Sequence, residues 1–169
     1  MFEQEDKHKY EDVDFNITEY LSQVQAKSDI ERKGILVLPT KDWQQSGVNV
    51  FMSETFDFVK WVKQKSTNDF SISVATTKDK RVAEMKSDNI LLPLVYLFSN
   101  VSIPIYLNMV ANYLYDKLKG KLGTDKTTVN LEVRSEDKKK GKVKRFSYHG
   151  SYEGFQKIVK KMDINEFME

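Results

Sequence analysis

The chain has 169 residues, and its 27 Lys or Arg against 25 Asp or Glu leave a net charge of only +2. Hydrophobic residues make up 40% of it and cysteine is absent, which excludes a disordered chain, a disulfide framework and a cysteine nucleophile. The near-neutral balance excludes a globally basic nucleic-acid coat. One domain, or two small ones, is expected at this length.

Residues 1–15 form an acidic N-terminal arm without the apolar core of a signal peptide, so a cytoplasmic protein is expected. Over residues 1–31, nine acids oppose three lysines. A helix over about 18–28 is predicted next, with Asn16 or Thr18 as its N-cap.

The segment 16–88 is predicted to be a βαβ-like half. Residues 34–39, GILVLP, form a continuous apolar run that is typical of a strand buried on both faces. The pattern then predicts, in chain order, a polar loop at 40–47, a short strand at 48–52, a helix from 53 to about 65 and an alternating strand at 70–75. The polar residues 76–88 are expected to form a loop with a short helix between the two halves.

The segment 89–115 carries no charged residue. Pro93 and Pro104 interrupt it, and each continuous apolar piece is shorter than the ~20 residues that a membrane span needs. We therefore predict two buried helices, at about 89–98 and 102–118, in preference to membrane insertion.

Alternation at 129–134 and 143–148 predicts a β-hairpin. Val143 is out of alternation with Phe146 and Tyr148, which indicates a bulge near Lys144–Arg145. Ser151 is expected to cap a final amphipathic helix. The predicted fold class is therefore α/β: a βαβ-containing N-terminal half packed with apolar helices, a C-terminal hairpin and a last helix, with 16–88 and 89–169 forming one compact unit.

The loop at 40–47 is a candidate ligand site, because ligands of open α/β sheets bind outside the carboxyl ends of strands. An ordinary solvated connection is the alternative interpretation. A small α/β enzyme or nucleotide-sensing domain would use Asp42 and Ser46 there. The full set of candidate ligand-binding residues is Thr40, Asp42, Ser46 and Gly47.

The motifs of phosphate-binding loops and of serine hydrolases, GxGxxG, GxxxxGK[ST] and GxSxG, do not occur. The only histidines, His8 and His149, are far apart in sequence, so neither a metal nor a cofactor is expected. Glu54 and Asp57 are interpreted as favourable charges at a helix N-terminus and not as paired catalytic carboxylates.

Between residues 117 and 145, eleven basic residues oppose four acids. A solvated turn, whose lysines discourage edge pairing, is one interpretation, and contact with phosphates is the other. A nucleic-acid binder would use Lys138, Lys139, Lys140, Lys142, Lys144 and Arg145.

One face of the second apolar helix carries Tyr106, Met109 and Tyr113 at the spacing i, i+3, i+7. This face is either core or an interface with a partner. Anchors of this kind supply most of the binding energy of protein interfaces.

The order of apolar helices, the hairpin VNLEVRSEDKKKGKVKRFSYHG and a short amphipathic helix spans residues 89–162. This order resembles the effector-associated constant components of bacterial conflict and antiphage systems. The resemblance implies a non-enzymatic adaptor or assembly module in phage defence, with a protein partner or self-association, and it assigns no functional residue. We therefore expect a non-catalytic interaction module first, an α/β enzyme or nucleotide sensor second and a nucleic-acid binder third; a membrane partner is not expected.

Overall fold

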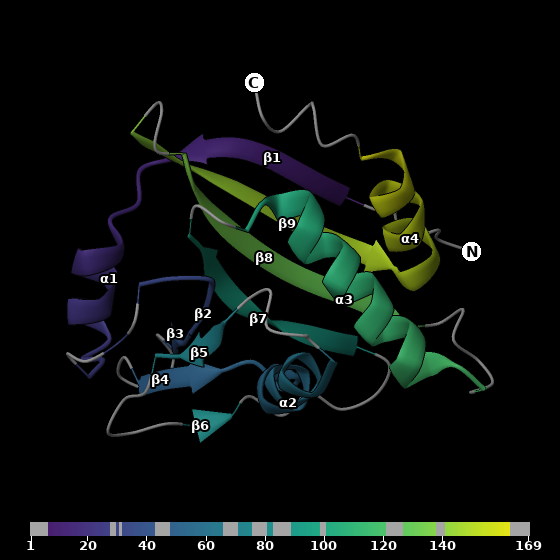
Figure 1. Cartoon of the computed structure of the whole chain (residues 1–169), viewed down its shortest axis with the longest axis horizontal. Helices are drawn as coiled ribbons and strands as arrows, with labels where there is room; N and C mark the ends of the chain where they lie inside the picture. Colours follow the sequence, from purple (N-terminus) through teal and green to yellow (C-terminus); the bar gives the residue numbers. More distant parts are fainter. Residues whose placement is uncertain are drawn as a thin grey trace.

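The computed structural model describes residues 7–27, 30, 32–42, 48–65, 71–75, 81–82, 89–98, 101–120, 127–137 and 141–162. Its centre is a six-stranded mixed sheet with the strand order β1-β9-β8-β7-β2-β5 (Figure 1). These strands are β1 (Lys7–Val13), β2 (Ile35–Leu38), β5 (Ile72–Val74), β7 (Asn89–Leu97), β8 (Thr128–Asp137) and β9 (Lys142–Ser151). A second sheet contains β3 (Thr40–Asp42), β4 (Val48–Phe51) and β6 (Arg81–Val82).

Helices lie on both faces of the large sheet. The main core joins one face to α2 (Thr55–Lys65), α3 (Ile103–Leu118) and α4 (Tyr152–Lys161), and a smaller core joins the other face to α1 (Ile17–Gln23). Figure 1 shows α3 lying across β7 and β8, with α4 beside it. The predicted α/β class is confirmed, and because β7 lies between β2 and β8, the sheet runs through both predicted halves.

The βαβ unit is present as predicted. Strands β2 and β5 are parallel neighbours, and α2 lies between them in the chain. All four residues of β2 are buried, as expected for a continuous apolar strand covered on both faces. The buried stripe of α2 contains Thr55, Phe58, Val59 and Val62, which is the i, i+3, i+4, i+7 pattern of the sequence.

The first of the two predicted apolar helices is wrong: residues 89–97 form strand β7. This strand lies between β2 and β8 and is buried on both faces. Its sequence therefore lacks the alternation of apolar and polar residues by which a half-exposed strand is identified. Pro93 lies where the pairing with β8 shifts register, between Leu91 and Leu94, so its missing N–H does not break a regular ladder. The second predicted helix is confirmed as α3, with Ser102 as its N-cap. Among the described residues, no helix is long and apolar enough to cross a membrane.

The C-terminal hairpin and last helix are confirmed, but the predicted bulge near Lys144–Arg145 is wrong. The pairing of β8 with β9 keeps one register from Thr128 opposite Ser151 to Asp137 opposite Lys142. Val143 is out of phase with Phe146 because it faces the smaller core on the α1 side. β9 contributes apolar residues to a core on each side of the sheet, and this gives the same break in alternation that a bulge would give.

The described part of the predicted N-terminal arm contains a strand. Residues Lys7–Val13 form β1, which pairs antiparallel with β9 at the edge of the sheet. Asn16 caps α1 as predicted, although the helix ends at Gln23. Of the predicted loop at 40–47, Thr40–Asp42 form a strand, and 43–47 lie outside the described residues. Arg81–Val82, within the predicted loop and helix at 76–88, also form a strand.

Candidate functional site

Strands β8, β9 and β1 present polar side chains on the side of the sheet that lies opposite α2, α3 and α4. Side chains alternate along a strand, so the residues between the core-facing Leu131, Val133, Phe146 and Tyr148 point to this second side. The helix on that side, α1, shares a small core with residues of β2 and β7, to which β9 contributes only Val143. We call this surface the polar sheet face; its residues are Lys7, Lys9, Glu11, Asn130, Glu132, Arg134, Arg145, Ser147 and His149.

An ion-pair network fixes the middle of the polar sheet face. Arg145 Nε lies 2.9 Å from Glu132 Oε1 and 3.7 Å from Glu11 Oε1. Arg134 donates to the other oxygen of Glu132, with an Nη2–Oε2 distance of 3.3 Å. The side chains of Arg134 and Glu132 are 19% and 29% exposed, so their charges are screened less than a fully exposed pair. The Arg134 guanidinium also lies 4.3 Å from the ring centroid of Phe15. These side chains are therefore held in defined positions.

The other side of the β1–β9 pair carries a second set of charges. Lys144 Nζ lies 2.8 Å from Asp12 Oδ1, and Lys142 Nζ lies 4.0 Å from Asp12 Oδ2. The hydrogen bond with Asp12 raises the pKa of the Lys144 ammonium. Lys144 also lies over the ring of Tyr10, 5.4 Å from its centroid. The acidic residues of the N-terminal region therefore neutralise basic residues of the hairpin.

This neutralisation bears on the predicted basic patch. Lys142, Lys144 and Arg145 each have an acidic partner on β1 or β8. The other three candidates, Lys138, Lys139 and Lys140, lie outside the described residues.

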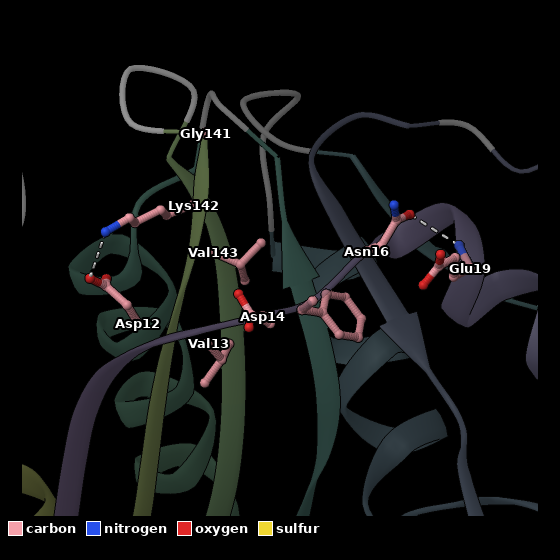
Figure 2. Close-up of a pocket in the computed structure, with 9 residues that line it drawn as sticks. Asp12, Val13, Asp14, Asn16, Glu19, Gly141, Lys142 and Val143 are labelled. Carbon is pink, nitrogen blue, oxygen red and sulfur yellow. Dashed lines mark hydrogen bonds and ion pairs between the residues drawn. The ribbon is translucent and has the colours of Figure 1, made fainter.

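A groove of about 440 Å³ lies where β1 leads into α1, beside the turn before β9. Its lining includes the carboxylates of Asp12, Asp14 and Glu19 and the ammonium of Lys142. Figure 2 shows Asp12 turned toward Lys142 and Asn16 turned toward Glu19. Asn16 Oδ1 accepts the Glu19 N–H at 3.1 Å, and Glu19 lies in the first turn, where the helix dipole favours an anion. Asn16 and Glu19 thus stabilise the start of α1, whereas Asp12 and Lys142 link β1 to β9.

A third polar cluster links α2 and the residue before it to α3 through hydrogen bonds and an ion pair. Tyr113 donates its hydroxyl to Glu54 Oε2 at 2.6 Å, and Lys117 pairs with the other oxygen of Glu54. Burial, followed by the hydrogen bond to Glu54, raises the pKa of the Tyr113 hydroxyl. The Trp61 indole N–H donates to Asp116 at 2.9 Å and makes a second link between the helices. Glu54 is therefore more than the helix-terminal charge predicted from sequence: it is the acceptor that joins the two helices.

We expect Glu54→Ala to lower the free energy of unfolding by about 2–3 kcal/mol, because it leaves a partly buried ammonium and hydroxyl without their acceptor. Tyr113→Phe removes one hydrogen bond and should cost only about 1 kcal/mol. Urea denaturation of the single variants and of the double variant measures the coupling between the two residues. Equal costs for the two single variants would contradict this role of Glu54.

The other predicted site residues do not converge. Thr40 donates its hydroxyl to the Val50 carbonyl at 3.3 Å, which supports the pairing of β3 with β4. Asp42 pairs through its backbone with Val48, and Ser46 and Gly47 lie outside the described residues. The described part of this loop is thus built into the small sheet.

The two histidines lie on neighbouring strands but on opposite faces. In the pairing of β1 with β9, His8 is opposite Tyr148, whereas Lys7 is opposite His149. His149 Nδ1 is within hydrogen-bond distance of Asn130 Oδ1. Across the part of the chain that the structure describes, no three His, Asp or Glu residues gather as a metal site.

Of the two interpretations of the Tyr106–Met109–Tyr113 face, the structure supports the core. Tyr106 is fully buried and Tyr113 is 5% exposed, and both pack edge-on against Phe58. Met109 is partly buried against the same core. The two tyrosines are therefore unavailable to a partner while the domain is folded.

Sequence reasoning missed the network of Glu11, Glu132, Arg134 and Arg145 as a unit. The sequence did indicate that Glu132 and Arg134 lie on one face, because both occupy the outward positions of a predicted strand. The other half required the unpredicted strand β1.

A scan with protein-family models, a search of curated proteins and a search of solved structures found no match to this chain.

Proposed function

We propose that this chain is a non-catalytic interaction module and that the polar sheet face binds a protein partner. The observation that carries the proposal is the half-buried network of Glu132, Arg134 and Arg145 on a face that α2, α3 and α4 do not cover. Because these side chains are already held in place, a partner would bind them with little further loss of side-chain entropy. Arginine is enriched at protein interfaces.

The charges of the polar sheet face favour a protein over a nucleic acid. Glu11 and Glu132 lie among its cations, and carboxylates at these positions would repel a phosphate backbone. A protein surface of alternating charge would complement both signs. The resemblance of residues 89–162 to components of antiphage systems supports placing such a module in bacterial defence.

The proposal is tested by adding charge to the polar sheet face. Tagged protein would be purified from its natural host after nuclease treatment, as wild type and as Ser147→Glu/His149→Glu. Both substituted positions lie on β9 and are exposed or partly exposed. We expect a partner that co-purifies with wild type to be reduced at least about tenfold in the variant, through loss of electrostatic complementarity. Quantitative mass spectrometry measures the ratio of partner to bait.

A matched control adds the same charge elsewhere. Asn108→Glu/Asn112→Glu places two glutamates at exposed positions of α3, and it should retain the partner fully. Circular dichroism checks that all three proteins are folded. Retention of the partner by Ser147→Glu/His149→Glu would overturn the proposal. A partner that co-purifies only from a parallel sample without nuclease, with salt-dependent binding of a labelled oligonucleotide, would favour the nucleic-acid alternative.

A further inference from the structure

Strand β1 ends the sheet with an exposed edge. Within the described residues it is the terminal strand and pairs with β9 alone. Six of its seven residues are exposed, and only Val13 is partly buried. Edge strands offer unpaired backbone groups to a further strand, and proteins commonly protect them with proline, a bulge or charge. β1 has neither proline nor a register shift, so its side-chain charges decide what pairs with it.

The charges of β1 form a self-complementary pattern. The sequence KHKYEDV places bases before Tyr10 and acids after it. In an antiparallel pairing of β1 with a second β1 centred on Tyr10, Lys9 of each copy lies opposite Glu11 of the other. The same register places His8 opposite Asp12 and Lys7 opposite Val13. Residues directly opposite in an antiparallel pair share a face, so every cross-strand charge pair formed is attractive.

We propose that two copies of this chain associate through their β1 edges, antiparallel and centred on Tyr10, so that one continuous sheet runs through both copies. Such a contact is isologous, because the same residues contribute from both copies, and it closes around a twofold axis. The lysines that would discourage an unrelated strand are, in this one register, the partners of the second copy's acids.

The proposed contact continues the network of the polar sheet face. Glu11 already lies 3.7 Å from Arg145, which in turn lies 2.9 Å from Glu132. Lys9 of the second copy would reach the exposed side of Glu11, whose side chain is 46% exposed. The ion-pair network would then continue from Glu132, Arg145 and Glu11 of one copy to Lys9 of the other. Lys9 and Glu11 belong to both the β1 edge and the polar sheet face. The two proposals are distinguished by their readouts, because self-association is measured on the purified chain alone and the protein partner is tested through Ser147 and His149 of β9.

A charge-swap experiment tests the register. Lys9→Glu places a second carboxylate opposite Glu11 of the other copy, and Glu11→Lys places two lysines opposite each other. Sedimentation velocity over a range of concentrations should show a concentration-dependent wild-type dimer and at least about tenfold weaker self-association of each variant. An equimolar mixture of the two variants restores attractive pairs, so it should form a heterodimer. Lys157→Glu, at an exposed position of α4, carries the same charge change as Lys9→Glu and should dimerise like wild type.

The absence of cysteine from the chain provides a second measurement. In the proposed register, two copies of Tyr10→Cys would face each other at a Cα separation of about 4.5–5.5 Å, which suits a disulfide. Lys7→Cys would face Val13 and should not crosslink under the same mild oxidation. A monomeric wild type at all concentrations, a mixture that remains monomeric, or equal crosslinking of both cysteine variants would overturn the proposal.

Discussion

Tyr106→Glu is expected to abolish folding. Tyr106 is fully buried, and its ring packs against Phe58 with the centroids 6.0 Å apart. Within the described chain, its hydroxyl has no hydrogen-bond partner, so nothing there would stabilise a carboxylate. Burying an unpaired charge ranks among the most costly substitutions, above about 4 kcal/mol, which is comparable to the whole stability of many domains. Circular dichroism and urea denaturation would show an unfolded or strongly destabilised protein.

The same helix supplies the control. Tyr115 is 59% exposed, so Tyr115→Glu makes the same chemical change in contact with water. Its cost should stay within about 0.5 kcal/mol, which is usual for surface substitutions. A folded Tyr106→Glu protein that had lost only binding of a partner would contradict the core assignment. It would restore the interpretation of this face as an interface.

The elements that the sequence predicted well are those with one buried face. The stripes of α2 and α4 and the alternation of β8 follow from a single core on a single side. Strand β7 has a core on each side, and its uninterrupted apolar residues fit a buried helix equally well. Strand β1 has the opposite difficulty: its residues are exposed on both faces, and only pairing with β9 makes it a strand. Such elements depend on neighbours that are distant in the chain.

For the candidate site too, the sequence predicts the local features but not the contacts between segments that are distant in the chain. The sequence shows an acidic N-terminal region and a basic hairpin, but the two are more than a hundred residues apart in the chain. Their meeting follows from the register that places Glu11 opposite Arg145 and Asp12 opposite Lys144. Local periodicity carries no information on that register. The basic hairpin therefore carries less free positive charge than its own sequence indicates, because Glu11 and Asp12 of β1 partly cancel it.

Gly34→Ala is expected to lower the free energy of unfolding by about 2–4 kcal/mol, from a backbone penalty of about 1–2 kcal/mol and a steric clash of similar size. Gly34 precedes β2 with φ of 68°, in the left-handed region that favours glycine. A Cβ atom there would overlap the Ser71 carbonyl oxygen. That oxygen cannot yield easily, because it accepts the Ile35 N–H at 2.8 Å where β2 meets β5. Relief of the clash would therefore separate the two parallel strands.

Gly120→Ala isolates the backbone part of this cost. Gly120 follows α3 with φ of 76°, and a Cβ atom there meets no other atom within 4 Å. Its alanine variant should therefore cost only the left-handed penalty, about 1–2 kcal/mol. Urea denaturation of the two variants gives the difference directly, and that difference measures the steric contribution of Ser71. Equal costs would mean that β5 moves away from Gly34 without loss of pairing energy, which the buried, hydrogen-bonded contact of β2 with β5 argues against.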